Sequence, residues 1–252
     1  LNVIIFSIMW LVGGFKVDSE VLIKFGAKFN YNMVNGEWWR FITPMFLHVD
    51  LMHLMMNTLG VISLSQPLKH IFGLKRLLLI YFIAGVSGVV MSFAFSNSLS
   101  AGASTAIFGM LGTHVYLYFR HKEAYRYIFG TQFLTLIAIN FIYGFVVQGI
   151  DNYGHLGGFI GGIVVAYALG IKTDAIKRKQ LLAIPLLAAV TAMGIQYGFV
   201  RYNLSADYYF MHFVDAVKSE DYNEAYKRLE EGLKRYPNDQ RLNDVLDQLN
   251  KG

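Results

Sequence analysis

Long apolar runs recur along the first four-fifths of this 252-residue chain, and they constrain its fold more than any other feature. Apolar residues make up 55% of the sequence and charged residues only 15%, whereas soluble domains carry about a quarter charged residues. The longer runs suit the ~30 Å hydrocarbon layer of a bilayer. Lipid offers an open backbone no hydrogen-bond partners outside a helix. We therefore expect an all-α, polytopic membrane helical bundle.

The apolar runs predict seven membrane spans. The second span is short and carries polar residues, which is typical of a helix inside a bundle. A long segment, 14–50, separates the first two spans, and its Trp38, Trp39 and Arg40 suit the headgroup level of a membrane. The predicted spans cover residues 1–13, 51–66, 75–95, 104–119, 126–147, 153–171 and 180–200.

Basic residues are distributed unevenly over the loops between these spans. The loops after the second, fourth and sixth spans carry clusters of Lys and Arg, whereas 96–103 and 148–152 carry none. By the positive-inside rule, the basic loops are cytoplasmic and the bare loops face outward. Segment 14–50 would also lie outside, and its basic residues disagree mildly with this orientation; they are Lys16, Lys24, Lys28 and Arg40.

Residues 204–252 have the mixed charge of a water-soluble tail, which the seven-span topology places outside the membrane. They predict amphipathic helices at 208–218 and 222–236, and a third at 242–249. The helix pair resembles one tetratricopeptide-type repeat, and a single repeat does not usually bury its own core. Its packing surface could be a protein partner, a second copy or the membrane domain; a purely stabilising tail is the alternative. We therefore predict two domains, 1–203 and 204–252.

Composition and missing motifs exclude several classes of protein. The chain has no cysteine, which excludes disulfides, thiolate metal sites and cysteine proteases. Its net charge is +5, and its Lys and Arg residues lie mainly between apolar runs. This distribution indicates membrane topology and no nucleic-acid surface. No HExxH motif occurs, which argues against zinc proteolysis, and no pair of aspartates lies within the spans, so an aspartyl mechanism has no residues to use. The chain starts at Leu1 inside an apolar run without a basic n-region, which we interpret as a first span in a fragment or processed form.

Two polar residues lie at the outward ends of different predicted spans. Ser104 follows Gly102 at the start of the fourth span, and a helix N-terminus there favours developing negative charge. His155 opens the sixth span at similar depth, and an imidazole with an ordinary pKa of ~6.5 is a suitable base for a serine. Gly158 and Gly162 should let another helix, expected to be the fourth span, approach closely. A lone serine is more often a packing residue, but the matched histidine favours a catalytic pair.

A third polar position lies on the second span, where His53 and Asn57 are one helical turn apart and point the same way. Two neutral donors on one face could stabilise a tetrahedral oxyanion beside the Ser104 backbone N–H. The alternative is a polar seam that holds helices together. We interpret His48 as structural. Asp151 lies in a short outward loop, and we favour a serine–histidine dyad over a triad that uses it.

Together these motifs resemble those of the rhomboid family of intramembrane serine proteases, over roughly residues 1–171. The seventh span and the tetratricopeptide-like tail are similar to a bacterial subgroup of that family. The resemblance implies a six-helix catalytic core plus one extra span, with Ser104 as nucleophile and His155 as base, and it implies no metal and no cofactor. The matching motifs are Trp39-Arg40, His53-Leu-Met-Met-Asn57, Gly102-Ala-Ser104, and Gly154-His155 followed by Gly158 and Gly162.

The resemblance implies an endopeptidase of the cell membrane that cleaves transmembrane segments of membrane proteins near the outer leaflet. Its active site and tail would open to the extracytoplasmic side, and Phe108 would stack on His155. A transmembrane helix hides its carbonyls in hydrogen bonds, so substrates should carry helix-weakening Gly or Pro. Thr105 replaces a glycine that is common in the family. We expect it to affect the helix contact or the substrate pocket, and we predict small side chains at the cleaved position.

Two other functions remain as alternatives. A catalytically silent rhomboid-like scaffold would bind membrane clients without cutting them, but it predicts loss of Ser104 or His155. A transporter would use a polar pathway through His53, Asn57 and His155, but transporters tend to show internal repeats, and none is visible in this sequence.

Overall fold

The computed structural model describes residues 1–173 and 175–250, and every regular element in these ranges is helical. The prediction of an all-α helical bundle is therefore confirmed. The elements are α1 (Asn2–Val12), α2 (Ser19–Phe25), α3 (Asn30–Val34), the 3-10 turns η1 (Trp38–Phe41) and η2 (Thr43–Phe46), α4 (Leu51–Phe72), α5 (Leu74–Phe95), α6 (Ser104–Arg120), α7 (Lys122–Phe129), α8 (Gln132–Val146), α9 (Asn152–Leu169), α10 (Arg178–Leu181), α11 (Ala183–Asn203), α12 (Ala206–Lys218), α13 (Tyr222–Arg235) and α14 (Gln240–Leu249).

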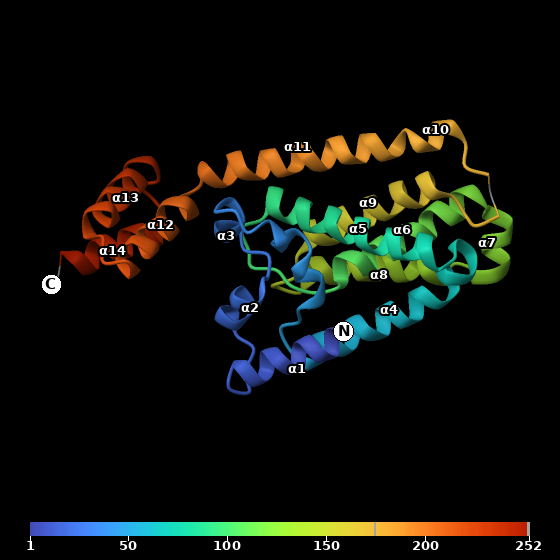
Figure 1. The fold of residues 1–252 in the computed structure, drawn as a ribbon, viewed down its shortest axis with the longest axis horizontal. Coiled ribbons are helices and arrows are strands. Elements are labelled where there is room, and N and C mark those ends of the chain that lie inside the picture. Colours follow the sequence, from blue (N-terminus) through green and yellow to red (C-terminus); the bar gives the residue numbers. More distant parts are fainter. Residues whose placement is uncertain (174, 251–252) are drawn as a thin grey trace.

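Helices α5, α6 and α9 form the centre of the bundle (Figure 1). Glycines on α9 permit the close contact, because a Cβ atom at Gly158 or Gly162 would overlap backbone atoms of α6. A Cβ at Gly161 would lie 2.7 Å from the Cβ of Ser87 in α5. Small residues allow helix backbones to approach in this way. The expected approach of the fourth predicted span to the glycine face is therefore observed, and α5 packs on α9 as well.

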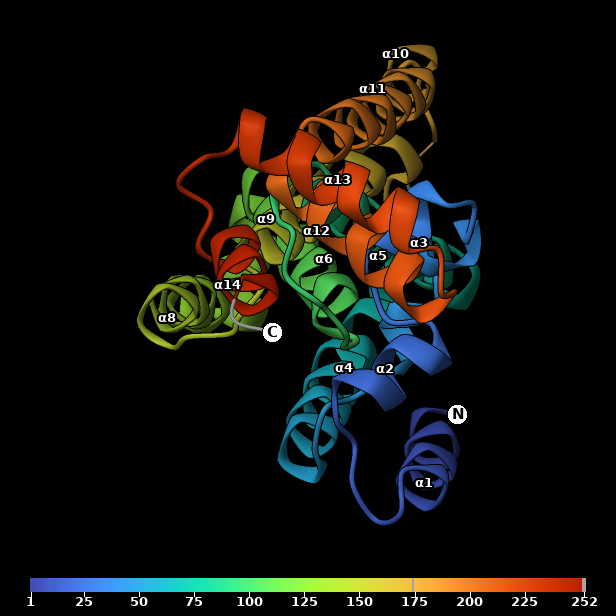
Figure 2. The same cartoon turned by 90° about the vertical axis from the view of Figure 1, so that its left-hand side faces the viewer.

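The remaining long helices surround this centre. Helix α4 packs beside α6, with α1 beyond it, and α11 runs along α5 and α9 (Figures 1 and 2). The buried side chains between these helices are almost all apolar, so dispersion and close packing hold the bundle together. The largest buried cluster includes Leu64, Leu68, Phe72, Leu77, Ile80, Phe108, Met110, Leu111, Tyr116, Leu117, Val165 and Ala166.

The observed helices differ from the predicted spans at two places. The run predicted as one span over 126–147 is two helices, α7 and α8, bent by 82° at their junction. Gly130 lies in this junction with φ +60°, a conformation that favours glycine. The predicted second span, 51–66, extends to Phe72 as helix α4, which contains Pro67.

Two helical segments of the described chain, Leu74–Phe95 and Arg178–Asn203, are long and apolar enough to cross a bilayer by length and composition. The bent pair of α7 and α8 is a third if it counts as one span. These segments indicate a multi-pass membrane protein. The other predicted spans correspond to helices that are shorter or carry more polar residues, so the number of seven stays a prediction.

Segment 14–50 folds against the bundle and buries two of its basic residues. Arg40 is 3% exposed and Lys28 is fully buried. Arg40 forms an ion pair with Glu37 at 2.6 Å and donates a 2.7 Å hydrogen bond to the Ala27 carbonyl. These two residues are internal structural groups, so they do not act as loop charges in the positive-inside rule. Two of the four basic residues that disagreed with the predicted outward orientation of this segment are therefore accounted for.

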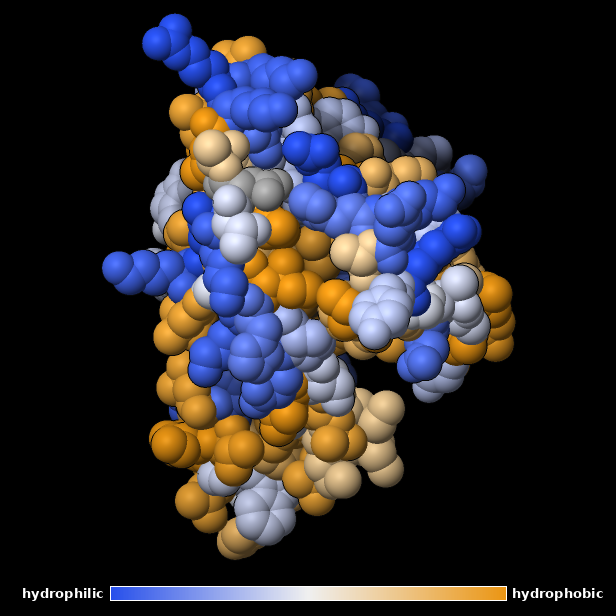
Figure 3. Space-filling view, turned by 90° about the vertical axis from the view of Figure 1, so that its right-hand side faces the viewer, coloured by the Kyte–Doolittle hydropathy of each residue, from blue (hydrophilic) through white to orange (hydrophobic). Residues whose placement is uncertain are grey.

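The two ends of the bundle differ in character. Loops rich in Lys and Arg lie at the end near α7 and α10, and hydrophilic side chains gather on this end with apolar ones around them (Figures 1 and 3). Helices α12, α13 and α14 lie at the opposite end (Figure 1). There the tail packs on the membrane domain, one of the three surfaces considered above; the ring of His212 lies 5.3 Å from that of Tyr31.

Candidate active site

Ser104 is the first residue of α6, at the end of the bundle where the tail lies. Gly102 precedes it with φ +136°, and a Cβ there would lie 2.8 Å from the imidazole Cε1 of His53. Only glycine therefore fits both the backbone conformation and the space at this position. The Gly102 N–H donates a 2.8 Å hydrogen bond to the Pro44 carbonyl. This contact fixes the loop that precedes Ser104 and so places Ser104 at the N-terminus of α6.

His155 lies in the first turn of α9, and its Nε2 atom lies 2.9 Å from the Oγ atom of Ser104. This distance is that of a hydrogen bond between a hydroxyl and an imidazole. The two residues come from helices that meet through the glycines of α9, so the backbone contact sets the distance between the side chains. A serine hydroxyl held on an imidazole nitrogen is the arrangement of an activated nucleophile and its base.

Phe108 orients the imidazole from the other side. Its ring stacks on that of His155 with centroids 4.0 Å apart and planes inclined by 12°. Phe141 of α8 packs edge-on against Phe108, with centroids 5.1 Å apart. Phe108 lies four residues after Ser104, so it projects from the same face of α6. The Phe108 ring, itself held by Phe141, thus restricts rotation of the imidazole and keeps its Nε2 directed at the hydroxyl.

Asp151 caps α9 and makes no hydrogen bond to the imidazole among the described residues. Its Oδ1 atom accepts a 2.9 Å hydrogen bond from the Gly154 N–H, as an N-cap carboxylate does. Its Oδ2 atom is buried without a hydrogen-bond partner. The geometry is therefore that of a serine and histidine pair whose helix is capped by an aspartate.

His53 lies close to the pair, whereas the Asn57 amide is directed elsewhere. The imidazole of His53 approaches Gly102, two residues before the serine. The Nδ2 group of Asn57 donates a 2.8 Å hydrogen bond to the His53 carbonyl within α4, and its Oδ1 atom is buried without a partner. His53 therefore lies beside the loop before Ser104, whereas the Asn57 amide is turned to its own helix; the oxyanion role of both residues stays a prediction. The ring of His48 packs at 5.2 Å from that of His53 and is fully buried.

Thr105 fills a gap between helices. It is 5% exposed, and its side chain faces the glycines of two neighbouring helices, so that a Cβ at Gly88 would lie 2.7 Å from the Thr105 Cβ. A Cβ at Gly154 would lie 3.2 Å from its methyl group. Of the two effects expected for Thr105, the structure thus favours the one on helix contact.

Sequence reasoning missed the residues that hold the loop before the nucleophile. The buried Lys28 donates through Nζ to the carbonyls of Ser96 and Ser98 at 2.7 and 3.0 Å, and its backbone pairs with that of Ser100. Burial lowers the pKa of Lys28 to about 7. Asn30, also buried, donates to the Ser96 carbonyl at 3.0 Å. The only signal in the sequence was a lysine on the side where few are expected, and we interpreted it as a loop charge.

The Trp39-Arg40 motif stabilises this same region. Arg40 bonds the Ala27 carbonyl, directly before Lys28, so it fixes the backbone that pairs with the nucleophile loop. Trp39 is 55% exposed, as a side chain at the headgroup level would be. Among the described residues, no group of three or more His, Asp or Glu side chains could hold a metal ion.

Residues 35–172 match the Rhomboid domain family. Rhomboid protease GluP of Bacillus subtilis is 41% identical over 198 residues, which cover 79% of this chain and 39% of that relative. Putative rhomboid protease YdcA of the same organism is 29% identical over 164 residues, covering 64% of this chain and 82% of that relative. RHOMBOID-like protein 6, mitochondrial, of Arabidopsis thaliana is 36% identical over 156 residues, covering 60% and 50%. The chain thus spans well under half of GluP.

Proposed function

The chain belongs to the rhomboid family, and we propose that it is an intramembrane serine endopeptidase that cleaves transmembrane segments of other membrane proteins. The observation that carries this proposal is the 2.9 Å contact between the Ser104 Oγ and the His155 Nε2 atoms. Neighbouring backbone and rings hold both groups in place, as a nucleophile and its base require. The names of the relatives, which include rhomboid proteases, support the same activity.

In the proposed mechanism, the Ser104 hydroxyl attacks a peptide carbonyl of the substrate while its proton passes to the Nε2 atom of His155. The tetrahedral intermediate collapses when the imidazolium gives that proton to the departing amine, which leaves an acyl-enzyme on Ser104. Water then attacks the ester, again with His155 as base, and releases the second product. The stacked ring of Phe108 keeps the imidazole in one orientation through both steps.

The oxyanion would be held by donors at the N-terminus of α6. The first-turn N–H groups of a helix have no intrahelical acceptor, so the Ser104 amide is available. The imidazole of His53 lies beside Gly102 and supplies a second donor. Asn57 contributes only after its amide leaves the His53 carbonyl, to which it donates at 2.8 Å. We therefore assign His53 and the Ser104 amide the larger part of this stabilisation.

Substrates should be transmembrane helices with weak points. A helix hides its carbonyls in internal hydrogen bonds, and Gly or Pro lowers the free energy needed to expose one. We propose cleavage near the outer leaflet, because both members of the dyad begin their helices at the end of the bundle opposite the basic loops. A narrow, glycine-lined site should favour a small side chain at the cleaved position, and no further protein partner is needed for the chemistry.

We propose a bacterial cell-membrane location with the dyad and the tail on the extracytoplasmic side. The gathering of basic loops at the other end of the bundle supports this orientation (Figure 3). We also propose two domains, a membrane protease domain over 1–203 and a tetratricopeptide-like helical tail over 204–252. The Ser205 N-cap of α12, which follows directly after α11, supports a boundary there.

The experiment that tests the proposal is cleavage of a model transmembrane substrate in proteoliposomes, with Ser104→Ala as the matched control. Wild-type protein should cleave at a helix-weakened position, and Ser104→Ala should retain only a trace of the rate. A scan of the cleaved residue should favour small over aromatic side chains. Equal turnover by wild type and Ser104→Ala would contradict the proposal. Client binding without turnover by either would favour the alternative of a silent scaffold.

A further inference from the structure

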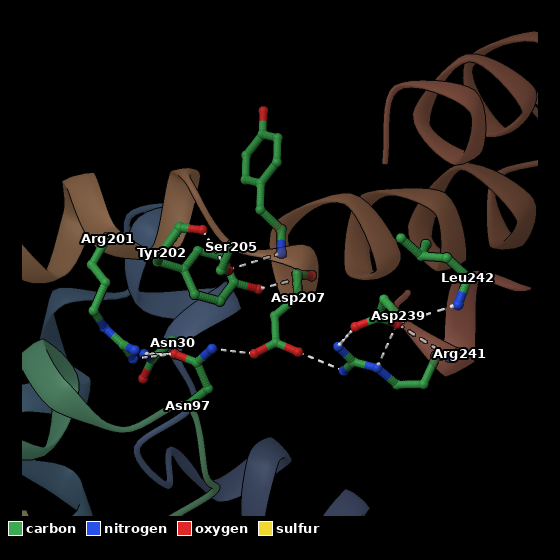
Figure 4. Close-up of polar contacts among 10 residues, drawn as sticks. Asn30, Asn97, Arg201, Tyr202, Ser205, Asp207, Asp239, Arg241 and Leu242 are labelled. Carbon is green, nitrogen blue, oxygen red and sulfur yellow. Dashed lines mark hydrogen bonds and ion pairs between the residues drawn. The ribbon is translucent and has the colours of Figure 1, made fainter. Parts of the chain in front are cut away.

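The loop 96–103 leads directly into Ser104 and is held by several contacts from elsewhere in the chain. Lys28 and Pro44 of the segment before α4 hold its middle and its end. Near its beginning the side chain of Asn97 adds a contact to the tail, because it lies between Arg201 of the bundle and Asp207 of the tail (Figure 4). A contact at this point can affect the nucleophile, because Ser104 lies at the end of the same short loop.

The side-chain amide of Asn97 is a junction between three parts of the chain. Its Oδ1 atom accepts hydrogen bonds from Arg201 at the end of α11 and from Asn30 of α3, the latter at 3.3 Å. Its Nδ2 group donates to the Oδ2 atom of Asp207 in the first turn of α12. Both ends of the amide are therefore satisfied, and the carboxylate that accepts its hydrogen bond comes from the tail (Figure 4).

Asp207 extends this junction to the last helix of the tail. Its Oδ1 atom forms an ion pair with Arg241, which also pairs with Asp239 at 2.9 Å. Asp239 is the N-cap of α14, so one chain of polar contacts links α14 to the loop before Ser104 (Figure 4). Charge-assisted hydrogen bonds of this kind are stronger than neutral ones.

An alternative role for Asp207 would be to cap α12, but another residue does this. The Ser205 side chain is the N-cap and accepts a hydrogen bond from the Tyr208 N–H. One carboxylate oxygen of Asp207 accepts from the loop and the other pairs with α14. Asp207 therefore connects the loop before Ser104 to the last helix of the tail.

We propose that Asp207 is a positioning residue, through which the C-terminal tail holds the loop that places Ser104 against His155. His155 belongs to a separate helix, so a shift of the loop changes the distance between the two groups. A displacement of about 1 Å can lower a rate by on the order of 100-fold; a loop that keeps its other contacts should shift less. This inference rests on the proposed protease function.

A reciprocal exchange tests the proposal. Asp207→Asn leaves one acceptor oxygen where Asn97 and Arg241 each use one, and Asn97→Asp sets two carboxylates against each other. The double variant Asn97→Asp/Asp207→Asn restores one amide and one carboxylate with the same net charge. We expect kcat, and the rate at which a fluorophosphonate labels Ser104, to fall about tenfold in each single variant. Both values should return to near the wild-type level in the double variant, with KM little changed throughout.

Controls separate this role from mere stabilisation of the tail. Asp244→Ala removes an exposed carboxylate from the same tail and should leave kcat unchanged. Asn97→Ala lies in the loop, so its effect does not depend on the tail folding correctly. Unchanged kcat in Asn97→Ala and in Asp207→Asn would overturn the positioning role, as would a change in KM alone. An inert wild-type protein would instead contradict the proposed function.

Discussion

The Nε2 atom of His155 lies 2.9 Å from the Oγ atom of Ser104, although 51 positions separate the two residues in sequence. The contact depends on backbone packing: α9 meets α6 through Gly158 and Gly162, where a Cβ atom on α9 would overlap the backbone of α6. The separation of hydroxyl and imidazole is thus set by how closely two helices approach. That dependence can be tested away from the reacting groups.

Gly158→Ala should lower activity without touching either reacting side chain. The new Cβ would overlap the carbonyl of Thr105, so α9 must move away from α6 and carry His155 with it. A displacement of about 1 Å predicts a loss of activity on the order of 100-fold. The measurement is kcat in proteoliposomes. Gly194→Ala in α11 is the matched control, because its Cβ would meet a single methyl group at 3.0 Å; equal activity of the two variants would contradict the prediction.

Phe108→Ala should lower kcat by removing the ring that orients the imidazole. Aromatic pairs contribute about 0.5–1.5 kcal/mol beyond their burial, which predicts a loss of roughly two- to tenfold. Phe108→Tyr keeps the stacked ring and should retain most of the activity. Steady-state kinetics of both variants check this. A Phe108→Ala enzyme with wild-type kcat would show that the imidazole is oriented by other contacts.

Arg40→Ala should destabilise the fold more than removal of a surface charge. Arg40 is 3% exposed and bonds the half-buried Glu37 and the Ala27 carbonyl, so its loss leaves a buried carbonyl without this donor. Leaving a buried acceptor unpaired typically costs about 1–3 kcal/mol. Unfolding in mixed detergent micelles measures the difference. Lys16→Ala, which removes an exposed pair with Asp18 at 3.6 Å, should change stability by less than about 1 kcal/mol.

Lys28 should make stability rise with pH on the alkaline side of neutrality. Burial lowers the pKa of Lys28 from its ordinary value of 10.5 to about 7 in the folded protein. Between these values the unfolded chain binds more protons than the folded one, so the free energy of unfolding increases with pH. One such proton adds up to about 1.4 kcal/mol per pH unit. The Lys28→Met variant should show a shallower pH dependence between pH 7 and 9; parallel curves would contradict the assignment.

The sequence predicted much of the fold because lipid restricts it so strongly. Apolar runs located the helices, and polar residues at helix ends located Ser104 and His155. The bend between α7 and α8 was missed because the short polar break Gly130-Thr131-Gln132 was included in one apolar span. The burial of Lys28 was also missed, because a lysine in a loop normally indicates topology.

The helices of the tail were also predicted from the sequence, whereas its attachment to the bundle was not. Its three helices were expected near their observed positions because their apolar residues recur at helical spacing. Its attachment to the bundle depends on pairs such as Asn97 and Asp207, which are 110 positions apart and carry no local pattern. The direction of the Asn57 amide is equally invisible in sequence, because a donor on a helix face can bond its own backbone as readily as a neighbour.

The central claim is that the imidazole of His155 activates the hydroxyl of Ser104, and fluorophosphonate labelling followed by peptide mass spectrometry tests it most directly. Wild-type protein in detergent should carry the adduct on Ser104, and His155→Ala should label at least about 100-fold more slowly. Ser104→Ala should carry no adduct. An adduct on another serine, or equal labelling rates for wild type and His155→Ala, would contradict the account.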